Sequence, residues 1–160
     1  DFATFFSNGL CAVKKNSNFG FINKKGETII PFIYDSAICF TEGMACVKRN
    51  KKIGYIDRSN KIVVPFIYDE AEHFSDGLAR VIKDNRCGYI NKTGQIIVPF
   101  IYEDGWPFTN GIAAVKKNNK YGFINKKGEI IKDFRYEQAL FSSGGYAIVI
   151  YKEKMLLVKI

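Results

Sequence analysis

The segment KIGYIDRSNKIVVPFIY, residues 52–68, decides the fold, because similar segments begin at the same spacing along the chain, at Asn18, Arg86 and Lys120. In each copy a glycine is followed by an aromatic residue and an isoleucine, and these glycines are Gly20, Gly54, Gly88 and Gly122. The spacing holds without an insertion along all 160 residues. One unit of about 34 residues is too small to bury its apolar side alone, so the sequence predicts a tandem array whose neighbouring units share a core.

The whole chain, residues 1–160, reads as a single repeat array. Its units cover about residues 1–34, 35–68, 69–102 and 103–136, and a partial capping unit covers 137–160. The last unit has Leu156 in place of the repeated glycine, and atypical terminal repeats are typical of the caps of open arrays. A four-stranded blade of a closed ring usually takes about 40 to 45 residues, more than one unit offers. We therefore expect an open stack, with a small closed β-propeller as the alternative.

Each unit is expected to form a short three-stranded antiparallel meander in an all-β fold. In the second unit, short segments rich in valine, isoleucine and aromatic residues lie near 44–49, 52–57 and 61–68, separated by turn residues. The third segment is apolar on both faces up to its proline, so we expect neighbouring units to cover it on both sides. Proline cannot donate a ladder hydrogen bond, which predicts a position at a strand end or a sheet edge.

The turn between the second and third strands indicates a left-handed backbone conformation. Three units have glycine at one position of this turn and the remaining unit has asparagine, giving the set Gly26, Asn60, Gly94 and Gly128. Asparagine is among the non-glycine residues that most readily accept a positive φ, so we predict a positive φ at all four positions. On the second strand, the repeated glycine before the aromatic residue predicts the close approach of a neighbouring backbone.

The cysteines are interpreted as apolar substitutes. They are Cys11, Cys39, Cys46 and Cys87, and other units have Ala, Phe, Ile or Tyr at the same positions. We expect four free, largely buried thiols, which are typical of a reducing compartment and favour a cytoplasmic location. His73 is the single histidine, so no metal site is expected. The longest apolar run is far below the ~20 residues of a membrane span, which predicts a soluble chain, and the start at Asp1 indicates a processed chain or part of a longer one.

A family resemblance rests on the fourth unit and the residues before it. They comprise Pro99-Phe100-Ile101-Tyr102, then Phe108-Thr109-Asn110-Gly111-Ile112-Ala113-Ala114-Val115, then Tyr121-Gly122-Phe123-Ile124-Asn125-Lys126-Lys127-Gly128. This pattern resembles the bacterial WG repeat family, also called KWG repeats, over nearly the whole chain. The tryptophan before the glycine is replaced here by Phe19, Ile53, Cys87 and Tyr121. The resemblance implies an all-β repeat module used for interaction or architecture, with no established catalytic motif to carry over.

Charge is segregated within the unit, on top of a net charge of +8. The nine-residue linkers that start each unit contain no Lys or Arg and ten of the 16 acidic residues, whereas the two turns of the four full units hold 18 of the 24 basic residues. Stacking predicts basic ridges beside an acidic seam, which would attract an acidic protein surface or a polyanionic glycan. An ordinary solvated surface is the alternative. Nucleic acid is disfavoured, because the aromatic residues are already assigned to the core.

Residues that break the repeat are the candidates for partner binding. Trp106 and Pro107 have no counterpart in the other units, and tryptophan is both a frequent interface anchor and a frequent core residue. Arg80 stands where other units have Ala12, Cys46, Ala114 and Ile148, which indicates that this face is partly exposed in the third unit. The candidate set is completed by basic residues of two units: Lys48, Arg49, Lys116, Lys117 and Lys120.

The function expected from the sequence is non-catalytic. Carboxylates surround His73, but no nucleophile motif, P-loop, dinucleotide fingerprint or metal-ligand spacing accompanies them, so we expect no catalytic residue and no cofactor. The repeated carboxylates, such as Asp35 and Asp69, indicate a structural role in turns. We expect a module for protein–protein interaction through its stacked surface. The alternatives are a carbohydrate or cell-envelope binding module and an architectural spacer of a larger protein.

Overall fold

The computed structural model describes residues 2–160, apart from the side chains of residues 2 and 141–143. Over this range the fold is all β, and 19 strands form five antiparallel sheets in which the strands lie side by side in chain order. The first four sheets have four strands each and the fifth has three. No helix long and apolar enough to cross a membrane occurs among these residues.

The strand bounds repeat with the period of the sequence. The first sheet contains β1 (Phe2–Ala3), β2 (Leu10–Lys15), β3 (Asn18–Asn23) and β4 (Thr28–Tyr34). The second contains β5 (Ser36–Ala37), β6 (Ala45–Arg49), β7 (Lys52–Ile56) and β8 (Ile62–Tyr68). The third contains β9 (Glu70–Ala71), β10 (Leu78–Lys83), β11 (Arg86–Asn91) and β12 (Ile96–Tyr102). The fourth contains β13 (Asp104–Gly105), β14 (Ile112–Lys117), β15 (Lys120–Asn125) and β16 (Ile130–Tyr136), and the fifth contains β17 (Gln138–Ser143), β18 (Tyr146–Tyr151) and β19 (Lys154–Lys159).

The expected three-stranded meander is present in the four full units, where β6, β7 and β8 lie at the positions predicted for the second unit, and the fifth unit contains the first two of its strands, β18 and β19. The hairpin between β6 and β7 turns at Asn50 and Lys51, whose φ values of 52° and 66° are those of a two-residue hairpin turn with both central residues left-handed. The sequence did not predict the two-residue strand inside the linker of each of the first four units. In the second unit this strand is β5, which pairs with the far edge of β6. Two residues are too few to produce a periodic pattern.

The predicted left-handed turn is confirmed in all four units. The φ values are +80° at Gly26, +65° at Asn60, +82° at Gly94 and +82° at Gly128. In the second unit the Asn60 amide donates a hydrogen bond of 3.0 Å to the Asp57 carbonyl, which closes the turn. The exchange of glycine for asparagine therefore reported the backbone conformation rather than flexibility.

The repeated glycine of the second strand faces the backbone of the next strand in the same sheet. A Cβ atom at Gly88 would lie 2.8 Å from the Val98 carbonyl oxygen, and the other three units show the same approach. The ladder is irregular at this point, because the register of β11 and β12 shifts between Cys87 and Tyr89. The predicted close approach is thus found, and it shapes each sheet rather than the contact between sheets.

Replacing Gly88 by alanine is expected to lower the free energy of unfolding by about 1 to 3 kcal/mol, because the new methyl group meets a backbone oxygen that cannot move aside cheaply. The matched control is Gly26→Asn, since Gly26 has open space around its Cβ position and Asn60 already occupies the same site in the next unit. This control should change stability by less than about 0.5 kcal/mol. Urea denaturation of both variants checks the prediction, and equal effects would contradict it.

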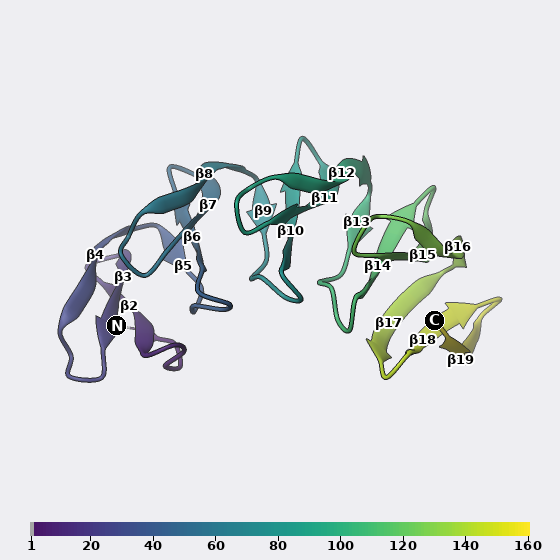
Figure 1. Ribbon diagram of the computed structural model, residues 1–160, viewed down its shortest axis with the longest axis horizontal. Helices are drawn as coiled ribbons and strands as arrows, with labels where there is room; N and C mark the ends of the chain where they lie inside the picture. The colour runs from purple at the N-terminus through teal and green to yellow at the C-terminus, as the bar shows by residue number, and fades with distance from the viewer. Residues whose placement is uncertain (1) are drawn as a thin grey trace.

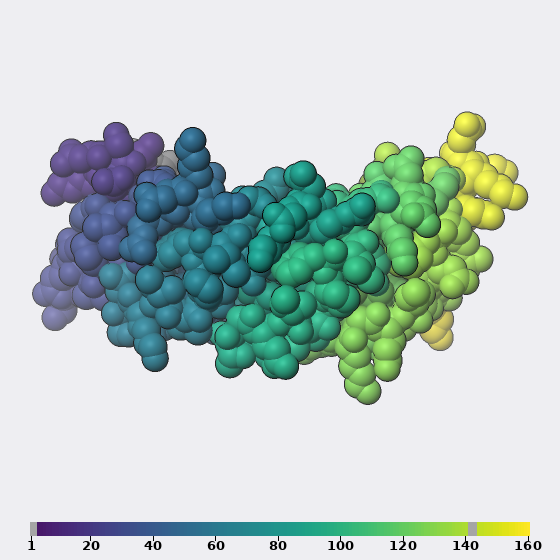
Figure 2. Space-filling model, turned by 90° about the horizontal axis from the view of Figure 1, so that it is seen from above, coloured from purple at the N-terminus to yellow at the C-terminus, as the bar shows by residue number. Residues whose placement is uncertain are grey.

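The five sheets follow one another along an arc, and the two chain ends lie at its opposite ends (Figure 1). Seen from above, the units form an elongated body with the first and last units at its two extremities (Figure 2). Each buried cluster combines two consecutive sheets: Ile56 of β7 packs with Phe21 and Ile30 of the first sheet, whereas the adjacent Tyr55 packs with the third. The expected open array, in which neighbouring units share a core, is confirmed.

The expectation that the third strand of each meander is covered on both sides was wrong. In β8, Val64 and Tyr68 are buried, but Ile62 and Ile67 are 43% and 40% exposed. The physical reason is the place of this strand, which is the last of its sheet and lies along the outer side of the arc, as β8 and β12 show in Figure 1. Pro65 is exposed at this sheet edge, where proline is tolerated.

All four cysteines are free, as predicted. Cys11, Cys46 and Cys87 are buried, and Cys39 is half-buried. Burial raises the pKa of the Cys46 thiol to about 12 and that of the Cys87 thiol to about 11. These two thiols are therefore protonated at neutral pH and serve as small apolar core groups.

Candidate partner-binding site

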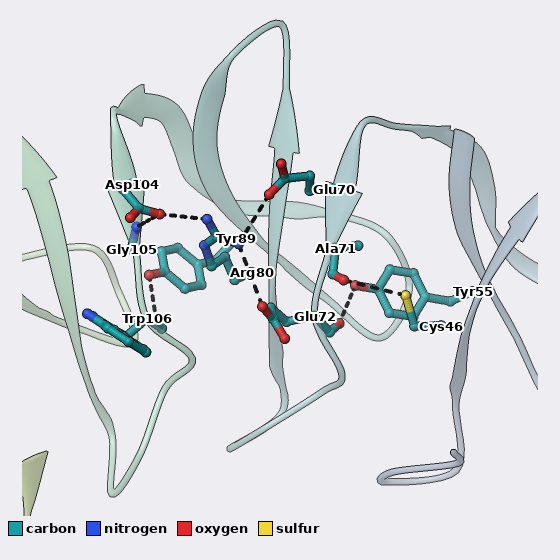
Figure 3. A network of polar contacts seen from close by, with 10 residues as sticks. All are labelled: Cys46, Tyr55, Glu70, Ala71, Glu72, Arg80, Tyr89, Asp104, Gly105 and Trp106. Carbon is teal, nitrogen blue, oxygen red and sulfur yellow. Dashed lines mark hydrogen bonds and ion pairs between the residues drawn. The ribbon is translucent and has the colours of Figure 1, made fainter. Parts of the chain in front are cut away.

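The boundary between the third and fourth sheets contains a polar network built around Arg80 of β10 (Figure 3). Its guanidinium donates a hydrogen bond of 2.6 Å to Asp104, and it lies 3.8 Å from Glu72 and 4.0 Å from Glu70. The side chain is only 10% exposed. Burial alone would lower the pKa of Arg80, but the hydrogen bond to Asp104 and the charge interactions with neighbouring groups, Asp104 and Glu72 among them, together outweigh it and raise that pKa. Arg80 is thus a cation enclosed between units, rather than part of a free surface.

Tyr89 of β11 completes this boundary. Its hydroxyl donates a hydrogen bond of 2.8 Å to the carbonyl of Trp106, and burial raises the pKa of this hydroxyl well above its ordinary value. Gly105 leaves room for the ring, because a Cβ atom there would overlap the Tyr89 hydroxyl. The same kind of bond joins the second and third units, where the Tyr55 hydroxyl donates to the carbonyl of Glu72 at 2.7 Å.

An open pocket of about 310 Å³ lies at the next boundary, between the fourth and fifth sheets. It occupies the place that Arg80 and Tyr89 take at the boundary between the third and fourth sheets. Ala114 stands there at the repeat position of Arg80, and Phe123 stands at that of Tyr89. The apolar wall of the pocket is formed by Trp106, Pro107, Ala114, Phe123, Ala139 and Leu140. Its polar groups come from His73, Ser75 and Thr109. The pocket is therefore lined by residues from three consecutive units.

Trp106 lies at this pocket with half of its surface, 51%, exposed to solvent. Its backbone is fixed on both sides, because its amide donates to the Ala114 carbonyl at 2.9 Å and its own carbonyl accepts from Tyr89. Of the two interpretations that the sequence left open, an interface anchor and a core residue, the exposure favours the anchor. A half-exposed indole on a fixed backbone is a preorganised contact surface.

None of the candidate basic residues belongs to the described lining of the pocket. Three of them, Lys116, Lys117 and Lys120, belong to the fourth unit, which also contributes Trp106 and Ala114 to the pocket. Lys120 donates a hydrogen bond of 2.9 Å to Glu137 of the next unit, and the Lys116 ammonium lies 5.7 Å from the centre of the Tyr121 ring. Lys117 is exposed. The other two belong to the second unit: Arg49 lies over the Phe66 ring at 4.6 Å, and Lys48 is half-buried.

The acidic seam has the structural role that the repeated carboxylates predicted. Glu137 bonds Lys120 with one oxygen, and with the other it accepts the Lys152 amide at the hairpin turn of its own unit. Asp69 does the same with Lys52 and the Asp84 amide. At these unit boundaries, a lysine from the basic turn of one unit therefore pairs with a carboxylate from the acidic linker of the next.

These bonds predict a loss of stability in acid. The hydrogen bond from Lys52 lowers the pKa of Asp69, and that from Lys120 lowers the pKa of Glu137. A depressed folded-state pKa stabilises the fold at pH values above the unfolded pKa, about 4, and that contribution is lost as the pH falls through the folded pKa. The melting temperature should fall less steeply below about pH 4 in the variant Asp69→Asn, Glu137→Gln than in the original chain. An Asp133→Asn control, at an exposed position of β16, should retain the original slope.

The pocket itself was not predicted from the sequence, apart from Trp106. The sequence pattern singles out neither His73 nor Leu140 as a binding residue, and Ala114 and Phe123 occupy ordinary repeat positions. The signal that could have found them is the comparison of Arg80 with Ala114 and of Tyr89 with Phe123. In both pairs the fourth unit has the smaller or less polar side chain.

The comparisons with solved structures identify the fold. A crystal structure of a eukaryotic initiation factor is similar with a TM-score of 0.64 at 12% identity, and the similarity covers 99% of this chain and 51% of that chain. The N-terminal domain of Nup159 is similar with a TM-score of 0.55 at 13% identity, covering 95% of this chain and 56% of the other. The chain thus spans about half the length of these solved chains. No curated protein matches it significantly.

The comparison with protein families concerns the repeat itself. The family described as WG containing repeat matches residues 1–18, 19–52, 53–87, 88–121 and 121–154. Together these segments cover nearly the whole chain, and the four longer ones follow the period read from the glycines to within one residue. With its tandem antiparallel sheets and this match over five segments, the chain belongs to the WG-repeat family.

Proposed function

We propose that this array is a non-catalytic binding module that holds a partner protein along its stacked surface, with the patch around Trp106 as the point of recognition. The observation that supports this proposal most is the half-exposed Trp106 beside a pocket that three units build. Tryptophan is enriched among the residues that dominate binding energy, especially where it meets a pocket. The patch is also unrepeated, so it offers one specific position on an otherwise periodic surface.

Charge supports an acidic partner. The chain carries a net charge of +8, and Lys116 and Lys117 lie on β14, the strand that also contributes Ala114 to the pocket. Basic groups at the rim of an interface steer an acidic partner and raise its association rate. The lysines of the fourth unit then raise the association rate of the complex, whereas Trp106 lowers its dissociation rate.

The lysine role is tested by replacing Lys116 and Lys117 with glutamine. We expect association to slow by roughly threefold to tenfold at low salt and to change little at about 1 M salt, where charges are screened within about 3 Å. The matched control replaces Lys14 and Lys15, which occupy the same two repeat positions in the first unit. Surface plasmon resonance with a partner purified on the immobilised array measures both rates. An equal effect of the two double variants would contradict recognition at the fourth unit.

A glycan is the second candidate, because an exposed indole is also a stacking platform. The described lining of the pocket contains no carboxylate and no amide side chain, and the Ser75 hydroxyl already donates to the Phe108 carbonyl at 2.7 Å. Few polar groups therefore remain to orient a sugar, which favours the protein partner. Digesting the bound fraction with protease separates the two candidates, since binding that survives digestion belongs to a glycan.

A further inference from the structure

The pocket beside Trp106 occupies a place that the chain fills with its own side chain one repeat earlier. Between the third and fourth sheets this place holds the Arg80 guanidinium and the Tyr89 hydroxyl. Between the fourth and fifth sheets, Ala114 and Phe123 leave it open. We infer that this pocket receives an uncharged apolar side chain of the partner protein, aromatic or long and aliphatic, inserted between the fourth and fifth sheets. This inference rests on the proposed function and names the chemical group that the site recognises.

The charge of the inserted group follows from the neighbours of Arg80. That cation is neutralised chiefly by Asp104 at 2.6 Å and also by Glu72 at 3.8 Å. At the pocket, the residues in the repeat positions of Asp104, Glu72 and Glu70, the third carboxylate beside Arg80, are Gln138, Trp106 and Asp104, and Asp104 is already paired with Arg80. A cation placed there would lose part of its water without gaining a free carboxylate partner, which carries a free-energy penalty. An uncharged side chain avoids this penalty.

The apolar character of the inserted group follows from the wall. Phe123 and Ala114 form a buried floor, and Trp106 and Leu140 are partly exposed at the sides. A volume of about 310 Å³ lies at the small end of the range for ligand sites, which suits a side chain with its adjoining backbone. Burying an apolar side chain against these groups is favourable in proportion to the area removed from water.

The test uses the full chain and small probes of each chemical type. Trp106 is the only tryptophan, so its fluorescence reports on the pocket directly. We expect N-acetyl-phenylalaninamide and N-acetyl-leucinamide to change this fluorescence saturably, and N-acetyl-argininamide to bind at least about tenfold more weakly, a difference of about 1.4 kcal/mol. Equal or tighter binding of the arginine probe would overturn the inference.

A repeat-swap variant supplies the second arm. The changes Ala114→Arg, Phe123→Tyr, Gln138→Asp and Ala139→Gly copy four residues of the preceding boundary: Arg80, Tyr89, Asp104 and Gly105. The variant should fill the pocket and abolish the response to both apolar probes. Should it fail to fold, as judged by circular dichroism, Ala114→Leu fills the same floor without a charge and is expected to weaken both probes at least about tenfold. Lys25→Gln, at an exposed position of the first unit outside the described lining, is the control and should bind the probes as the original chain does. Apolar binding that persists in a folded, filled variant would overturn the inference.

Failure of this inference is distinguishable from failure of the proposed function. If Trp106→Ala shortens the lifetime of the partner complex but no apolar probe binds, the binding module stands and the inserted side chain is rejected. If the probes bind as expected but the filled variant holds the partner unchanged, the pocket chemistry stands and the partner is recognised elsewhere.

Discussion

Replacing Ile90 by alanine is expected to lower the free energy of unfolding by about 2 to 5 kcal/mol, the usual cost of a large-to-small change in a core. Ile90 lies on β11, is fully buried, and packs against Tyr55 and Val64 of the preceding sheet. Sheets flank it on both sides along the arc, so little of the cavity can close by local movement. Ile56 has the equivalent position one unit earlier and should behave in the same way.

The control for this prediction is Val158→Ala in β19, at the end of the array. Val158 is only half-buried and lies in the last sheet, which has a neighbour on one side within the described chain. Its replacement should cost less than that of Ile90. Urea denaturation with an unchanged m-value measures both losses. Equal losses in the middle and at the end would contradict the open array, because only a closed ring lacks ends.

Replacing Trp106 by alanine is expected to shorten the lifetime of the partner complex by about 30-fold or more, equivalent to the roughly 2 kcal/mol or more of a hot-spot residue. A desolvated aromatic anchor acts mainly on dissociation, so the effect should be similar at low and high salt. The control is Tyr146→Ala, which removes another half-exposed aromatic ring that is not part of the described pocket lining.

The same substitution should leave the fold nearly unchanged. The hydrogen bonds at position 106 involve its backbone amide and carbonyl, which alanine retains. The free energy of unfolding is therefore expected to change by about 1 kcal/mol or less. If the variant unfolded the fourth unit, its effect on binding would reflect lost structure, and the anchor role would be rejected.

The features that the sequence predicted are those that depend on one unit alone. The constant spacing of the repeated glycines, the three strands of the meander and the left-handed turn at Gly26 and Asn60 all follow from local chemistry that recurs from unit to unit. Repetition turned weak local signals into firm ones: a single Gly-to-Asn exchange says little, but the same exchange in an aligned array identifies a positive φ. The burial of Cys46 was predicted in the same way, from the apolar residues that replace it elsewhere.

The features that the sequence did not predict depend on how two units meet. The exposure of Ile67 follows from the position of β8 at a sheet edge on the outer side of the arc, which no pattern within the strand reveals. The enclosure of Arg80 depends on three carboxylates from two different linkers. The pocket depends on a difference between consecutive boundaries, and only the stacked structure brings Trp106, Ala114 and Leu140 together.

The most direct measurement of the central claim is the quenching of Trp106 fluorescence by acrylamide, with and without the purified partner. Because Trp106 is the only tryptophan of the chain and is 51% exposed in the free array, its quenching constant reports the accessibility of the recognition point. The account predicts efficient quenching of the free array and a several-fold smaller quenching constant in the complex, in which the partner covers the indole. A quenching constant that stays the same when the partner is fully bound would contradict recognition at Trp106.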